Sequence, residues 1–204
     1  MISLEEYLRD PCGSLSVPLW KWRRMTVPGN LKILHQRDFV PMEGYRDECY
    51  FRLRHELQGI SGQIPAGYAV RTAEAEEILR IVEIINASYP DIRVSPEQIR
   101  SLTRTPVYAP ALWLLAVEES SGQAVGCVIA DLDKEAREGI LEWVQVLPEF
   151  RRKGIARALI LEALDRMEAD FATVSGQVDN ETSPELLYRA CGFTGSDIWH
   201  ILRK

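Results

Sequence analysis

The sequence lacks any long apolar run, and this absence excludes one class of protein at the outset. Its strongest apolar stretches, 111–117 and 124–130, are much shorter than the roughly 18 residues that a membrane helix needs. The opening residues include Glu5 and Glu6, where a secretory signal would be basic and then apolar. We therefore expect no membrane partner and no export, and we expect a cytoplasmic protein.

Cysteine pairs and an excess of basic charge are also missing. The four cysteines are scattered, with no Cys-x-x-Cys pair and no histidine near them at metal-ligand spacing, so we expect reduced thiols and no metal. The 24 basic residues are outnumbered by 30 acidic ones, so a global basic field for nucleic acid is absent. The three histidines are isolated in the sequence, which favours surface positions or positions with a satisfied partner in the core: His35, His55 and His200.

What is present is ordinary globular composition in 204 residues, which suits one domain with an extension. Prolines interrupt the chain repeatedly before Gly62, and regular patterns follow it. We expect an irregular N-terminal extension with short strands over 1–62, and one domain over 63–204. The extension contains a basic, tryptophan-bearing segment over 20–37. Such a segment can bind nucleic acid or another anion, although a solvated face is the favoured interpretation.

Periodicity predicts an α+β fold, in which a mixed sheet carries helices on its faces. Three-and-four spacing of apolar residues predicts a helix over 74–86, and Ser95 followed by Pro96 predicts a second helix start. Two apolar runs joined by 120–123 predict a hairpin. The expected strands are 31–39, 49–53, 67–72, 111–118, 124–132, 139–147, 171–178 and 198–202. Further helices are expected over 154–169 and 184–191, and a turn over 10–13.

The most informative stretch is the strand, turn and helix over 144–158. A strand ends at Pro148, and a helix begins near Gly154. The first amides of a helix have no intrahelical partner and carry partial positive charge, and Gly154 and Ala156 allow an anion to approach them closely. Four cations without an intervening acid add to this charge: Arg151, Arg152, Lys153 and Arg157. This geometry predicts a phosphate or diphosphate site, and the alternative is an ordinary basic surface turn.

The same residues resemble a known family. The run Arg151-Arg152-Lys153-Gly154-Ile155-Ala156 matches the Arg/Gln-x-x-Gly-x-Gly/Ala acetyl-CoA motif of the GNAT N-acetyltransferase superfamily. A second stretch, from Asn180 through Tyr188 to Gly192-Phe193, resembles the usual ending of that family. The resemblance covers about 63–204. It implies a mostly antiparallel GNAT-like sheet that is splayed at the cofactor strand.

The resemblance also implies roles for individual residues. The main chain of Val144, Gln145 and Val146 would pair with the pantetheine arm of acetyl-CoA, and Asn180 would hydrogen-bond the cofactor. The diphosphate would lie on the amides of the turn, which continue through Ile155 and Ala156. Tyr188 would act as general acid toward the leaving thiolate. Glu142 is the candidate base, acting directly or through water, unless it is an exposed residue paired with a cation.

The implied function is transfer of an acetyl group from acetyl-CoA to a primary amine of a small molecule or a protein. The amine attacks directly in a ternary complex, and this chemistry requires no metal. One alternative is a non-catalytic acyl-CoA-binding or sensor module. A second alternative is that segment 20–37 binds nucleic acid. The acidic total charge makes this the weakest of the three hypotheses. A homodimer and the identity of the acceptor amine stay open.

Overall fold

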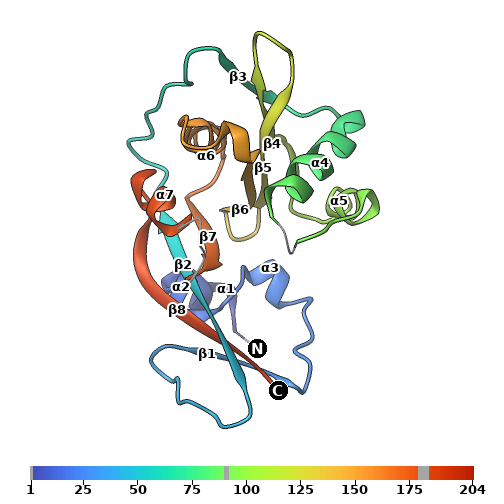
Figure 1. The fold of residues 1–204 in the computed structure, drawn as a ribbon. Coiled ribbons are helices and arrows are strands. Elements are labelled where there is room, and N and C mark those ends of the chain that lie inside the picture. Colours follow the sequence, from blue (N-terminus) through green and yellow to red (C-terminus); the bar gives the residue numbers. More distant parts are fainter. Residues whose placement is uncertain (1, 90–91, 179–183) are drawn as a thin grey trace. The chain divides into compact units, whose positions relative to one another are not determined.

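The chain is described by a computed structural model over residues 2–89, 92–178 and 184–204. It divides into two compact units (Figure 1). Unit 1 combines Met1–Glu56 with Phe171–Lys204, and unit 2 is Leu57–Asp170. The N-terminal segment thus shares a unit with the C-terminal strand. The boundary expected near Gly62, as the start of the family domain, stays a prediction.

Unit 1 contains an antiparallel sheet in the order β1-β8-β2-β7. Its strands are β1 (Leu31–His35), β2 (Arg46–His55), β7 (Phe171–Gln177) and β8 (Thr194–Arg203). Its helices are α1 (Leu4–Arg9), α2 (Pro11–Ser14), α3 (Leu19–Trp22) and α7 (Pro184–Ala190). The turn expected over 10–13 is wrong: it is the helix α2, because the Asp10 side chain accepts a hydrogen bond from the Gly13 amide and Pro11 takes the first helical position.

Unit 2 is an antiparallel meander in the order β6-β5-β4-β3. Its strands are β3 (Tyr68–Thr72), β4 (Tyr108–Glu118), β5 (Ala124–Asp133) and β6 (Glu138–Val146). Its helices are α4 (Ile78–Ser88), α5 (Pro96–Leu102) and α6 (Ile155–Asp165), with short 3-10 helices η1 (Ala75–Glu77) and η2 (Pro148–Phe150). The expected hairpin over 120–123 is confirmed, and Gly122 turns the chain at φ +71°.

Helices cover both faces of the unit 2 sheet. α4 and α5 lie on one side of β4 and β5, and α6 lies on the other (Figure 1). Ile81, Ile85 and Ile99 pack on the first face against Leu115 and Ile129, all nearly inaccessible to water. This burial follows the three-and-four spacing read in the sequence. The α+β fold class with helices on both faces is confirmed, whereas the expected splay beside β6 stays a prediction.

The start of α5 follows the capping rules. The Ser95 hydroxyl accepts from the Gln98 amide and the Gln98 side chain accepts from the Ser95 amide, so a capping box fixes the start of α5. The helix expected over 154–169 ends earlier, at Asp165, and Arg166 forms its C-cap. Among the described residues, no helix is long and apolar enough to cross a membrane.

Candidate functional site

The turn between β6 and α6 has an unusual backbone. Arg152 has φ +62° and Gly154, the N-cap of α6, has φ +81°. A left-handed conformation is natural for glycine but uncommon for arginine. Successive amides in such a turn form a concave surface of N–H groups that suits an anion. The sequence predicted the glycine here, but it gave no sign of the left-handed arginine.

The start of α6 is not capped by a side chain within the part of the chain that the structure describes, and its first turn, fully described, contains no acid. The chain's own α5 shows the contrast, with a capping box and an acid in the first turn. The first intrahelical bond of α6 runs from the Ala158 amide to the Gly154 oxygen, so the amides of 155–157 point past the helix end. Both features leave this helix end suited to an external anion.

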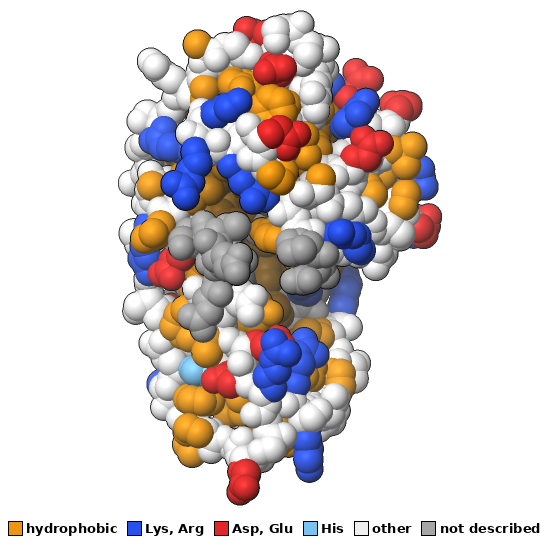
Figure 2. Space-filling view, viewed as in Figure 1, with side chains coloured by type: hydrophobic (Ala, Val, Ile, Leu, Met, Phe, Trp, Pro, Cys, Tyr) orange, Lys and Arg blue, Asp and Glu red, His pale blue; other side chains and the backbone are white. Residues whose placement is uncertain are grey.

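Positive charge surrounds this turn. Arg152, Lys153 and Arg157 are all exposed, and Figure 2 shows Lys and Arg side chains on the face of unit 2 that carries α6. The Lys153 ammonium lies 4.7 Å from the centre of the Phe150 ring, and this cation–π contact holds the lysine at the turn. These three side chains, with the amides, are the groups that could hold a diphosphate.

Arg151 is exposed like its neighbours, but it differs from them because its guanidinium group donates to two main-chain oxygens. Its Nε donates to the Val146 main-chain oxygen at 3.2 Å, and an Nη donates to the Ser88 main-chain oxygen at 2.6 Å. Arg151 therefore fastens the turn to the last residues of both β6 and α4. This is a positioning role, and the phosphate contact implied by the family resemblance stays a prediction.

The turn is supported from its other side by the segment before β3. Pro65 lies against Gly154, 3.4 Å from the position that a Cβ would take there. Tyr68 meets the Phe150 ring edge-on, with the ring centres 6.5 Å apart. Gly62 packs so closely on α6 that an added Cβ would lie 2.4 Å from Leu161. The loop conformation is therefore held by contacts on both sides before any ligand binds.

β6 presents the residues that the motif assigns to the pantetheine arm. Val144 pairs with Val128, Gln145 with Cys127, and Val146 with Gly126. Gln145 and Val146 are buried. The Gln145 Oε1 finds no hydrogen-bond partner among the described residues, which is costly for a buried amide oxygen. An unsatisfied acceptor on this strand is a feature that sequence reasoning missed, because burial of a glutamine is not visible in the pattern.

Glu142 occupies a special place on the same strand. The β5–β6 register shifts by one residue between Ile129 and Ala130, so Glu142 is the extra residue of a β-bulge. Bulges re-aim side chains and are common beside active sites. Glu142 as a whole is half-buried. Its role as a base stays a prediction.

Tyr188 belongs to unit 1, where its ring is 8% exposed. It packs between Phe51 and Phe193, with ring centres 6.1 and 5.8 Å away. Its main-chain oxygen accepts from the Phe193 amide, which closes the end of α7. Packing accounts for the ring, and the proton-donor role of the hydroxyl stays a prediction. Asn180, the other residue of this motif with an assigned role, lies outside the described residues.

An acidic residue of η1, the short helix before α4, serves the fold. The Arg71 guanidinium donates two hydrogen bonds of 2.6 Å to Glu77. These bonds lower the pKa of the Glu77 carboxyl to about 2. The carboxyl also accepts from the Glu74 amide and so closes a capping box at the start of η1. Glu77 is therefore committed to joining β3 to α4.

The histidines have partners that the sequence pattern did not reveal. His35 Nε2 lies 3.0 Å from Asp197 Oδ1, and His200 Nδ1 lies 2.8 Å from Asp47 Oδ2. His55 is buried beside Phe193, and burial lowers the pKa of its imidazole. Strand pairing creates these contacts, so only knowledge of the sheet register would have found them.

Comparison with known proteins gives a family match for part of the chain. Residues 110–195 match the family model described as an acetyltransferase (GNAT) domain. That span contains the bulged strand, the turn and the start of α6, together with Tyr188. The resemblance to the GNAT superfamily found in the sequence is thus confirmed by a family match over residues 110–195.

Solved structures show the same fold. A GCN5-related N-acetyltransferase from Sphaerobacter thermophilus is 26% identical with a TM-score of 0.68, and the match covers 79% of this chain and 53% of that one. A ribosomal-protein alanine N-acetyltransferase from Escherichia coli is 16% identical with a TM-score of 0.53, covering 66% and 91%. The NatC complex bound to a Gag peptide and CoA is 21% identical with a TM-score of 0.54, covering 67% and 97%.

The chain spans about half the length of the Sphaerobacter protein. No curated protein matches the chain significantly in sequence.

Proposed function

We propose that the protein transfers an acetyl group from acetyl-CoA to a primary amine. One observation supports this most strongly: the α6 start, without an acid or a side-chain cap among its described residues, follows a turn with exposed cations and two left-handed residues. The amides of 155–157 with Arg152, Lys153 and Arg157 would hold the diphosphate. The main chain of 144–146 would pair with the pantetheine amides, as the motif implies.

The proposed chemistry uses two groups of this chain. Glu142, on the bulge, would accept a proton from the attacking ammonium or amine, directly or through water. Tyr188 would donate its phenolic proton to the departing thiolate, since an ordinary phenol with a pKa near 10 is still protonated at neutral pH. A half-buried glutamate on a bulged strand suits the first role, and a hydroxyl on a tightly packed ring suits the second.

For the amine that accepts the acetyl group, we propose a chemical class and not a particular compound. The relatives in fold include an enzyme named for a ribosomal-protein alanine and a complex that holds a peptide. We therefore propose a small-molecule or protein amine. The proposal places the reaction in the cytoplasm, which is consistent with four cysteines that form no disulfide among the described residues.

Release of free CoA thiol over a panel of amines tests the proposal. We expect thiol release with at least one amine, and Tyr188→Phe should lower kcat by about 100-fold while leaving acetyl-CoA affinity unchanged. The phenylalanine keeps the ring packing between Phe51 and Phe193, so loss of folding is not expected. Acetyl-CoA binding without thiol release for any amine would instead identify a non-catalytic acyl-CoA-binding module.

A further inference from the structure

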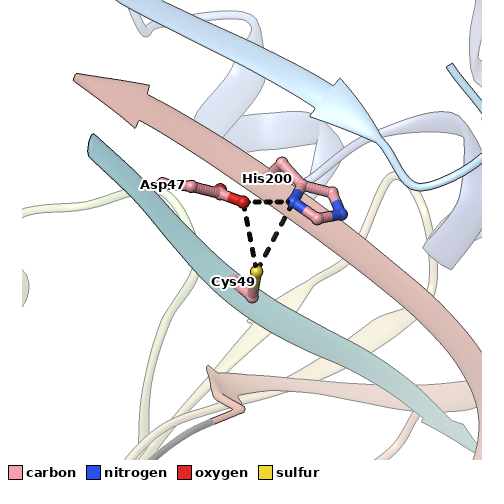
Figure 3. A group of neighbouring side chains, drawn as sticks. All are labelled: Asp47, Cys49 and His200. Carbon is pink, nitrogen blue, oxygen red and sulfur yellow. Dashed lines mark hydrogen bonds and ion pairs between the residues drawn. The ribbon is translucent and has the colours of Figure 1, made fainter. Parts of the chain in front are cut away.

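Three side chains with metal-binding chemistry meet on one face of the unit 1 sheet. Asp47 and Cys49 lie two positions apart on β2, so their side chains point to the same face of the sheet. His200 on β8 is the direct cross-strand partner of Cys49. Figure 3 shows the three side chains pointing toward one another. The juxtaposition follows from strand register, across 151 positions of sequence between Cys49 and His200.

The distances among the three donor atoms form a closed triangle. His200 Nδ1 lies 2.8 Å from Asp47 Oδ2 and 3.4 Å from Cys49 Sγ, and the thiol lies 3.6 Å from the same carboxylate oxygen. A tetrahedral Zn²⁺ with ordinary bond lengths separates such donor atoms by about 3.4–3.6 Å. Two edges of the triangle already have this length, and the third needs to open by about half an ångström.

The triangle does not have the connectivity of a proton relay. A relay uses both ring nitrogens of a histidine, one toward the nucleophile and one toward the carboxylate. Here the thiol and the carboxylate both approach Nδ1. A single proton on Nδ1 can make a hydrogen bond to only one of them, whereas one cation at the centre of the triangle can be bound by all three donor atoms.

The imidazole orientation is fixed by its surroundings. The Phe39 ring stacks on His200 with ring centres 3.6 Å apart and an interplanar angle of 7°. The His200 and Asp47 side chains keep 13% and 31% of their surface exposed, so an ion can reach them from solvent. Ring stacking and strand pairing therefore pre-set the donors, and this lowers the cost of arranging them around an ion.

We propose that Asp47, Cys49 and His200 bind a divalent transition metal of borderline softness, with Zn²⁺ as the best match. Thiolate, imidazole and carboxylate are all common zinc ligands, and a hard cation such as Mg²⁺ would not select the thiolate. Three protein ligands leave the fourth tetrahedral position for water or another ligand. This site lies within unit 1 and is independent of the acetyl transfer proposed above.

Cobalt substitution tests the site directly, on untagged, metal-free full-length protein. One equivalent of Co²⁺ should produce a thiolate-to-cobalt charge-transfer band, and Zn²⁺ should remove it. Cys49→Ser should abolish the band, and Asp47→Asn and His200→Gln should each weaken Co²⁺ binding at least tenfold. Circular dichroism of each variant establishes that it is folded.

Two variants serve as matched controls. Asp197→Asn removes the carboxylate of the other histidine pair on this sheet, where His35 takes the place of His200. Cys127→Ala removes a thiol that is wholly buried in unit 2. Both should keep the band unchanged. A folded wild-type protein without the band, or a band that survives in Cys49→Ser, would overturn the assignment and leave a hydrogen-bonded triangle.

Discussion

The guanidinium of Arg151 donates a 2.6 Å hydrogen bond to the main-chain oxygen of Ser88, the last residue of α4. The same side chain also bonds the Val146 oxygen at the end of β6. Arg151 thus holds three elements together. Both Arg151 and its neighbour Arg152 are exposed, so the two differ in these hydrogen bonds and not in exposure. We therefore expect a substitution of Arg151 to lower the stability of the protein and a substitution of Arg152 to lower its affinity for the ligand.

Arg151→Gln should lower the free energy of unfolding by about 1–2 kcal/mol, because two hydrogen bonds from a charged donor are lost. Arg152→Gln should change it by less than about 0.5 kcal/mol, because this exposed side chain donates no hydrogen bond to the described residues. Urea denaturation of both variants measures the difference. Equal stability of the two would contradict the positioning role given to Arg151.

Gly154→Ala should weaken acetyl-CoA binding, since the added methyl group narrows the approach to the helix amides. It should also cost about 1 kcal/mol of stability, because φ +81° strains any residue with a Cβ. Gly122→Ala is the matched control: it has φ +71° and open space around it, far along the chain from the turn. The control should lose similar stability with unchanged affinity. A loss of affinity in both variants would indicate a global effect.

Arg152→Glu should weaken acetyl-CoA binding at least tenfold, because a carboxylate would face the diphosphate. Lys134→Glu makes the same charge change at an exposed position between β5 and β6. That variant should bind like wild type in calorimetry at physiological salt. If the two charge reversals weakened binding equally, net charge rather than the turn would govern affinity.

Glu77 makes part of the stability depend on pH. Hydrogen bonds from Arg71 lower the pKa of its carboxyl to about 2, below an unfolded value near 4.3. The stabilisation is therefore complete above the unfolded pKa and is lost as the pH falls toward about 2. Glu77→Gln should cost about 1 kcal/mol at neutral pH, a figure reduced for partial exposure, and almost nothing near pH 2.

Urea unfolding at both pH values checks this, with Glu76→Gln on the same 3-10 helix as the control. Glu76 is exposed, so its substitution should be nearly neutral at both. A Glu77→Gln deficit that persisted unchanged at low pH would show that packing, and not the charge, explains the loss.

Local patterns predicted most of the fold. The helix α4 follows from apolar residues at three-and-four spacing, and α5 follows from Ser95 and Pro96. Both signals depend only on residues that are close in the sequence, so the two helices can be predicted without knowledge of the tertiary structure. The sequence predicts a turn where the helix α2 forms, because an aspartate followed by proline starts both kinds of structure.

Only the part of the candidate site whose residues are close together in the sequence was predictable. The motif located the turn and its glycine, since both lie within a few residues. It did not reveal that Arg151 reaches Ser88, because that contact joins residues 63 positions apart. The bulge at Glu142 and the pairing of Cys49 with His200 depend on strand register, which a one-residue shift would change completely.

Calorimetric titration of the wild-type protein with acetyl-CoA tests the central claim most directly, because the claim is that the amides and cations after Pro148 hold a diphosphate. The account predicts saturable binding of one acetyl-CoA per chain, with affinity that falls as salt is raised because the contact is ionic. Absence of binding at high micromolar acetyl-CoA, in protein shown to be folded, would contradict it.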